Sequence, residues 1–170
     1  MKFYLTSGTP EYMEKIQEKY PKEQMILLHG QGNSILMHES DKKSKFAAPR
    51  QFEVLEGRGE FEQRGFVAMY NVPVAEESKG LFEESVITAI QTLKNDTSCI
   101  AYRVLKPIKH EIYVIITQWA GPASFDKWID SEIFKAKLAP LLTNAASSTQ
   151  TMFTSKTYIT TYTAPAKEQD

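Results

Sequence analysis

The feature that most constrains the fold is a run of residues that is apolar on both faces of a strand. Residues 112–119 read Ile-Tyr-Val-Ile-Ile-Thr-Gln-Trp. A half-exposed strand alternates apolar and polar residues, whereas a strand covered on both faces reads as a nearly continuous apolar run. The pattern therefore predicts a strand that is central in its sheet and buried.

The segments around this strand predict a fold of alternating strands and helices. We expect strands or helices in the following order: a strand at 66–74, a helix at 81–93, strands at 100–105 and 112–119, a helical region in two pieces at 122–142, and a strand at 157–163. This order, β-α-β-β-α-β, is that of a ferredoxin-like unit. Because Pro73 has no N–H to donate, the first strand should be interrupted or lie at an edge just past Asn71.

The first 60 residues predict a smaller unit of the same kind. A strand at 2–5 precedes a helix at 10–20, for which Thr9 and Pro10 provide the N-cap and first position. A hairpin at 25–39 follows, with a further strand between residues 46 and 56. We predict an α+β protein with a βαββ unit at 1–60, whose sheet packs against that of a ferredoxin-like domain at 61–165, and a frayed tail at 166–170.

Composition excludes several functions. The 170 residues include a single cysteine, Cys99, and the net charge is −1. One thiol forms no internal disulfide and no cysteine-based metal site, and it fits a reducing, cytoplasmic compartment. No apolar run approaches the ~20 residues of a membrane span, and the balanced charge disfavours nucleic-acid binding. None of His29, His38 and His110 has a second ligand at metal-binding spacing, so no metal site is predicted.

The late helical region carries two apolar stripes that are out of phase. The first consists of Phe125, Trp128 and Ile129, and the second of Phe134, Leu138 and Leu141. A straight helix at about 100° per residue does not bring both stripes onto one face, so we expect a bend near Asp130 and Ser131, with Ser131 capping the second piece. A bent helix over a sheet provides either a concave apolar wall for a flat ligand or two stripes that both pack on the sheet.

These segments resemble a known family. Residues 65–142 are similar to the antibiotic-biosynthesis-monooxygenase (ABM) superfamily, whose fold is a ferredoxin-like dimeric α/β barrel. The stretch from Trp128 to Ala136 is similar to the helix motif of Isd-type haem-degrading monooxygenases, and Phe66–Asn71 to their first strand. The whole chain resembles two-part members, which include a bacillus-type haem monooxygenase and the TRAP proteins.

The resemblance implies roles for particular residues. Asn71 would lie near the haem iron as a hydrogen-bond donor, and Trp128 would press on the porphyrin. Leu138 stands where the family has the histidine that binds iron, and leucine has no lone pair to donate. The expected haem-binding set is Phe66, Phe125, Phe134, Leu138, Lys135 and Lys137, with the two lysines pairing with the propionates. No protein-bound metal is expected.

The resemblance leaves three functions open. In the first, the chain degrades haem weakly and releases iron, with dioxygen and an external electron-donating reductase or small reductant as co-substrates. In the second, it is a TRAP-type haem-binding or stress-signalling protein without turnover. In the third, it is an ABM-fold protein for another ligand. No nucleic-acid or membrane partner is expected. Because the N-terminal unit can supply the second half of the barrel, we favour a monomer with an internal pseudo-dimer over a homodimer.

Overall fold

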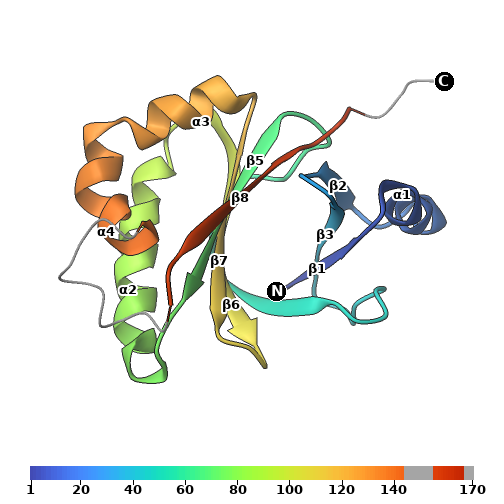
Figure 1. Cartoon of the computed structure of the whole chain (residues 1–170), viewed down its shortest axis with the longest axis horizontal. Helices are drawn as coiled ribbons and strands as arrows, with labels where there is room; N and C mark the ends of the chain where they lie inside the picture. Colours follow the sequence, from blue (N-terminus) through green and yellow to red (C-terminus); the bar gives the residue numbers. More distant parts are fainter. Residues whose placement is uncertain (144–154, 167–170) are drawn as a thin grey trace.

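The computed structural model describes residues 1–143 and 155–166, and these form a closed antiparallel barrel of eight strands (Figure 1). The elements are β1 (Lys2–Gly8), α1 (Pro10–Lys19), β2 (Met25–His29), β3 (Ser34–Ser40), β4 (Arg50–Arg58), β5 (Phe66–Pro73), α2 (Lys79–Ile90), β6 (Cys99–Ile108), β7 (Ile112–Trp119), α3 (Pro122–Ile129), the π-helical turn η3 (Phe134–Leu138), α4 (Ala139–Leu142) and β8 (Tyr158–Thr163). The strand order around the barrel is β1-β3-β2-β8-β5-β7-β6-β4.

The predicted α+β ferredoxin-like fold is confirmed, but the prediction of two separate sheets packed together is wrong. The strands of the N-terminal unit join those of the C-terminal unit in one sheet. The long strand β4 pairs with β1 on one side and with β6 on the other, which continues the hydrogen bonding across the two units. Closing the sheet removes edges that two open sheets would expose. A division into units at residue 60 remains a prediction.

The strand predicted to be central in the sheet is β7. It lies between β5 and β6, and every residue from Tyr113 to Trp119 is buried. The effect of Pro73 is also as expected: pairing with β8 ends at Asn71, while pairing with β7 continues to Pro73. Alternation along β5 places Ala68 and Tyr70 in one apolar core, and Val67 and Met69 in another.

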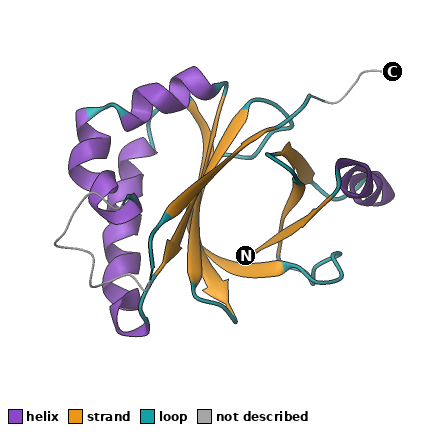
Figure 2. Cartoon of the chain, in the orientation of Figure 1, coloured by secondary structure: helices purple, strands orange, loops and turns teal. Residues whose placement is uncertain are grey.

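Three apolar cores hold the molecule together. One lies between the outer face of the C-terminal strands and the helices α2, α3 and α4, which cover that face together (Figure 2). The second fills the barrel interior, and the third lies under α1 on the outside of β1, β2 and β3. Helix α1 begins as predicted, with the side chain of Thr9 accepting from the Tyr12 N–H. Leu81, an apolar residue near the start of α2, is 61% exposed.

The late helical region bends where the two stripes change phase. α3 ends at Ile129, and the Ser131 hydroxyl then accepts from the Phe134 N–H at 3.2 Å, which confirms the predicted cap. The second piece includes the π-helical turn η3, whose extra residue per turn shifts the phase of the stripe. No helix among the described residues is long and apolar enough to span a membrane. Residues 167–170 of the predicted frayed tail lie outside the described part of the chain.

Candidate functional site

Trp128 lies in an aromatic cluster between α3 and the sheet. Its indole is 5.3 Å from the ring of Trp119 on β7 and 4.7 Å from that of Phe134 on η3. Phe125, one turn earlier on α3, lies 5.5 Å from Phe66 on β5. The structure therefore brings Trp128 together with the three phenylalanines that the resemblance implied for haem binding, and adds Trp119, which the sequence did not single out.

This cluster fills the space between the helices and the sheet. Trp128 is 6% exposed, Phe134 is 4% exposed, and Leu138 is completely buried. Phe134 also contacts Tyr70, whose burial raises the pKa of its phenol well above the ordinary value and keeps it neutral. Of the two possibilities left open by the sequence, the structure shows the second, in which both stripes pack on the sheet.

Asn71 lies on the opposite face of β5 from Trp128. It follows Val67 and Met69, which face the barrel interior, and its side-chain amide donates to the Tyr158 carbonyl at 3.3 Å and to the Thr160 hydroxyl at 3.2 Å. The structure therefore does not bring the carboxamide of Asn71 and the indole of Trp128 into one site.

A cleft opens on the outer side of Trp128, between the α3–η3 bend and the loop that leads into β6. We call it the Trp128 cleft. Its volume is about 480 Å³, within the range of ligand pockets, and its lining residues are Thr92, Leu93, Asp96, Ser98, Ser124, Lys127, Trp128, Ser131 and Ile133. The buried indole Nε1 of Trp128 has no hydrogen-bond partner among the described residues, and Ile133 is 52% exposed. Leu93, Trp128 and Ile133 form the apolar part of the lining, and the other six lining residues are polar or charged.

The two lysines of the expected haem-binding set lie on the exposed side of the bend. Lys135 is exposed and forms an ion pair with Asp130 at 3.3 Å, and Lys137 is also exposed. Neither lines the cleft, whereas Lys127 does. Among the described residues, no group of three or more potential metal-ligating side chains lies together.

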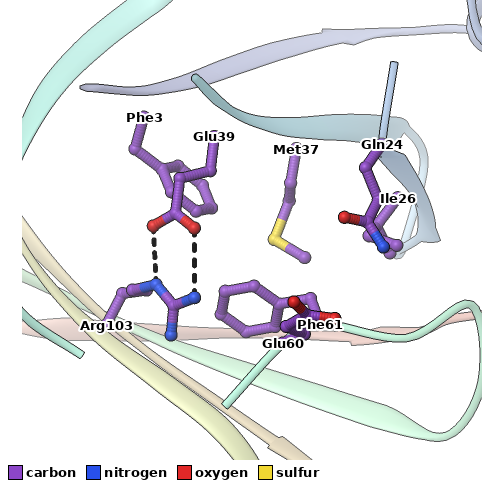
Figure 3. A pocket seen from close by; sticks show the side chains of 8 residues that line it. All are labelled: Phe3, Gln24, Ile26, Met37, Glu39, Glu60, Phe61 and Arg103. Atoms are coloured by element: carbon purple, nitrogen blue, oxygen red, sulfur yellow. Dashed lines mark hydrogen bonds and ion pairs between the residues drawn. The ribbon is translucent and has the colours of Figure 1, made fainter. Parts of the chain in front are cut away.

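An ion pair between a buried arginine and a partly exposed glutamate inside the barrel is a second candidate site, and no sequence motif indicated it (Figure 3). Arg103 on β6 donates to both carboxylate oxygens of Glu39 on β3, at 2.6 and 3.1 Å. Its other N–H groups donate to the backbone carbonyls of Arg58, Tyr102 and Gly59. All five donors of the guanidinium are used, so Arg103 offers none to a ligand in the adjoining hollow of about 100 Å³, and the pair serves to join the two halves of the barrel.

Comparison with known proteins finds a family similarity in the C-terminal part of the chain. Residues 65–139 match the family described as Antibiotic biosynthesis monooxygenase. Among curated proteins, the chain is related to signal transduction protein TRAP. It is 25% identical to TRAP of Staphylococcus epidermidis over 134 residues, which cover 79% of this chain and 80% of the relative. TRAP of Staphylococcus aureus strain MSSA476 is 23% identical over 133 residues, 78% of this chain and 80% of the relative.

Solved structures share the whole fold. A structure described as a major regulator of staphylococcal pathogenesis is similar with a TM-score of 0.85 and 21% identity, covering 96% of this chain and 99% of that one. The haem-degrading enzyme LmHde of Listeria monocytogenes is similar with a TM-score of 0.74 and 20% identity, covering 97% and 100%. At these identities the likeness concerns the fold alone.

Proposed function

We propose that the chain binds haem in the Trp128 cleft and degrades it at most weakly. The observation that carries the proposal is the indole of Trp128, which forms a wall of a ligand-sized cleft and keeps an unpartnered N–H. An unsatisfied buried donor costs free energy, and a carboxylate oxygen of a haem propionate would satisfy it. Lys127 at the rim would pair with the same propionate or with the second one.

The cleft offers the porphyrin apolar contacts and offers a propionate Lys127, although the carboxylate of Asp96 also lines it, and it offers the iron no imidazole. None of the residues that line it is a histidine, and Leu138, at the position of the family's iron ligand, points into the core and is fully buried. Without an axial ligand, affinity must come from burial of the porphyrin and from its charged edge. We therefore expect binding that is weaker than in an imidazole-ligated protein.

Support for turnover comes from the fold alone. LmHde, which shares the fold, is described as a haem-degrading enzyme, and on that analogy haem would be the substrate, with dioxygen and an external reductant. Asn71, the residue expected to assist this chemistry, faces the barrel interior instead. A TRAP-type protein that binds haem without turnover is the second candidate, and the lack of an iron ligand at Leu138 favours it.

Absorbance titration of the purified chain with haemin tests binding. We expect a saturable 1:1 change in the Soret band that Trp128→Phe and Lys127→Gln weaken, by about tenfold for the loss of a charge-assisted contact. Lys135→Gln is the matched control, because Lys135 is already paired with Asp130 outside the cleft. A change that does not saturate, or equal effects of the two lysine variants, would contradict the assignment.

A reductant added in air then separates the two candidates. Loss of the Soret band together with iron release, with catalase and superoxide dismutase present to suppress coupled oxidation, supports degradation. A stable complex under the same conditions supports binding without turnover. If haemin does not bind at all, an ABM-fold protein for another ligand remains.

The position of the porphyrin is tested by Leu138→His. If haem occupies the outer cleft, the new imidazole remains in the core, and the variant loses about 2–3 kcal/mol of stability without gaining haem affinity. A gain in affinity would instead show that the space occupied by Phe134 and Leu138 opens to admit haem.

A cytoplasmic location, expected from the single cysteine, stays a prediction.

A further inference from the structure

A second ligand-sized pocket lies at the end of the sheet opposite Trp128. It forms where the start of β4 meets the turn between β6 and β7, and its volume is about 450 Å³. The separation follows from the register of β5 and β7: Ile112 pairs with Pro73 at this end, and Trp119 pairs with Phe66 at the other. The residues that matter here are Arg50, Ile108, Lys109, His110, Ile112 and Tyr158. We call this the Arg50 pocket.

The Arg50 pocket concentrates positive charge, and the described part of the chain places no counter-charge in it. No carboxylate is among its lining residues, and neither Arg50 nor Lys109 forms an ion pair within the described chain. Lys109 adopts a left-handed backbone conformation with φ of 68°, which is uncommon for a residue other than glycine. In a chain whose charges otherwise balance, this end of the barrel favours an anion.

His110 adds an unsatisfied polar atom. The imidazole ring of His110 packs edge-on against the ring of Phe52, with 4.9 Å between their centres. The guanidinium of Arg50 lies 5.3 Å from the centre of the Phe52 ring. The buried Nε2 of His110 has no hydrogen-bond partner among the described residues. Burial, with the positive charge of Arg50, holds the pKa of His110 below its ordinary value, so the imidazole is neutral at pH 7. A neutral imidazole nitrogen can form a hydrogen bond with a ligand hydroxyl.

The remaining walls are apolar or aromatic. Ile108 and Ile112 line one side, and Tyr158, which is 48% exposed, lines another. Arg50 and Tyr158 also line a neighbouring hollow of about 280 Å³, whose lining includes the polar side chains of Asn71 and Thr160. A ligand for this pocket needs a negative charge for Arg50 and Lys109 and a flat apolar body for Tyr158 and the isoleucines.

We propose that the Arg50 pocket binds a small aromatic carboxylate that carries a hydroxyl group. The carboxylate pairs with Arg50 and Lys109, the ring packs against Tyr158 and Ile112, and the hydroxyl reaches the unpartnered Nε2 of His110. This site is separate from the Trp128 cleft and does not depend on haem binding.

Titration of the full chain with 4-hydroxybenzoate, followed by ¹H–¹⁵N correlation spectra, tests the proposal. We expect saturable shifts at Arg50, at the 108–112 turn and at Tyr158, with a dissociation constant below about 5 mM. Arg50→Gln should weaken binding about tenfold or more, because a charge-assisted contact is lost. Arg64→Gln is the matched control, since Arg64 is also exposed but pairs with Glu62 elsewhere.

Two further probes make the proposal falsifiable. 4-Hydroxybenzamide has the same ring without the charge and should bind about tenfold more weakly, and inorganic phosphate should not compete at equal concentration. Equal binding of the amide would overturn the role of the cations, and equal competition by phosphate would overturn the role of the ring. Shifts that do not saturate, or that Arg50→Gln leaves unchanged, would overturn the site as a whole. Trp128→Phe should leave this binding unaltered.

Discussion

At the scale of single residues, Gly65 is fixed by its backbone and by its neighbours. Its φ of +80° favours glycine, and a Cβ at this position would overlap the carbonyl oxygen of Trp119. We expect Gly65→Ala to lower the free energy of unfolding by about 1–3 kcal/mol in urea titrations. Gly80→Ala is the control: a Cβ there meets nothing within 4 Å, and the helix α2 should gain up to about 1 kcal/mol. Equal losses in both variants would contradict the explanation.

Cys99 illustrates how burial controls a single reactive group. The thiol is 1% exposed, and burial raises its pKa to about 11, so it is protonated at pH 8. Because the thiolate is the reactive species, we expect Ellman's reagent to label the native chain at pH 8 only as it opens, and the chain in urea at once. Rapid labelling of the native protein at a rate independent of unfolding would show that the thiol is accessible.

Residue-scale prediction from the sequence was correct where the signal was local. Strand alternation places Asn71 with Val67 and Met69, and that is where it lies, whereas its proposed role beside Trp128 came from family resemblance. The pair of Glu39 and Arg103 was missed because the two residues are 64 positions apart and no local pattern joins them. Only the closure of the barrel brings them together.

At the scale of elements, the bend between α3 and η3 depends on Ser131. Its hydroxyl donates to the Trp128 carbonyl at 2.6 Å and accepts from the Phe134 N–H at 3.2 Å, so it satisfies both helix ends. We expect Ser131→Ala to cost about 0.5–2 kcal/mol in chemical denaturation. Thr88→Ala on the exposed face of α2 also removes a hydroxyl-to-carbonyl bond, but it should be neutral or slightly stabilising. A neutral Ser131→Ala would mean that packing alone sets the bend.

The bend itself was predictable because two apolar stripes out of phase require one. The π-helical turn that completes the phase shift was not, since its residues are ordinary helix formers. Whether the bend encloses a ligand or packs on the sheet depends on how closely Phe134 and Leu138 approach β5 and β7. That distance is decided by tertiary packing, and the sequence alone left both outcomes open.

At the scale of the whole molecule, the order and type of the elements and the ferredoxin-like fold class were predicted correctly, whereas the packing of two separate sheets was wrong. Each strand has a local signal in its apolar pattern, but closure requires β4 to pair with both β1 and β6. These pairings join segments about 50 residues apart, and composition does not distinguish them from two stacked sheets.

A barrel closed within one chain supports the proposed monomer, for which light scattering should show a mass independent of concentration.

The barrel has one weak seam, and its behaviour provides the last prediction. β2 and β8 are joined by a single pair, His29 with Thr163, whereas β8 pairs with β5 along its whole length. On the β2 side, the side chain of Gln63 bonds to the Leu27 N–H and carbonyl in place of a strand, whereas β8 faces β2 with the single pair alone. We expect the β8 amides that face β2 to exchange with deuterium at least about 100-fold faster than those of β7, which is paired on both sides and buried. Within β8, the amides directed at β5 serve as the internal control and should be protected. If the β8 amides that face β2 exchanged as slowly as those of β7, the two strands would have to pair more extensively than the single bridge of His29 and Thr163, and the barrel would open elsewhere.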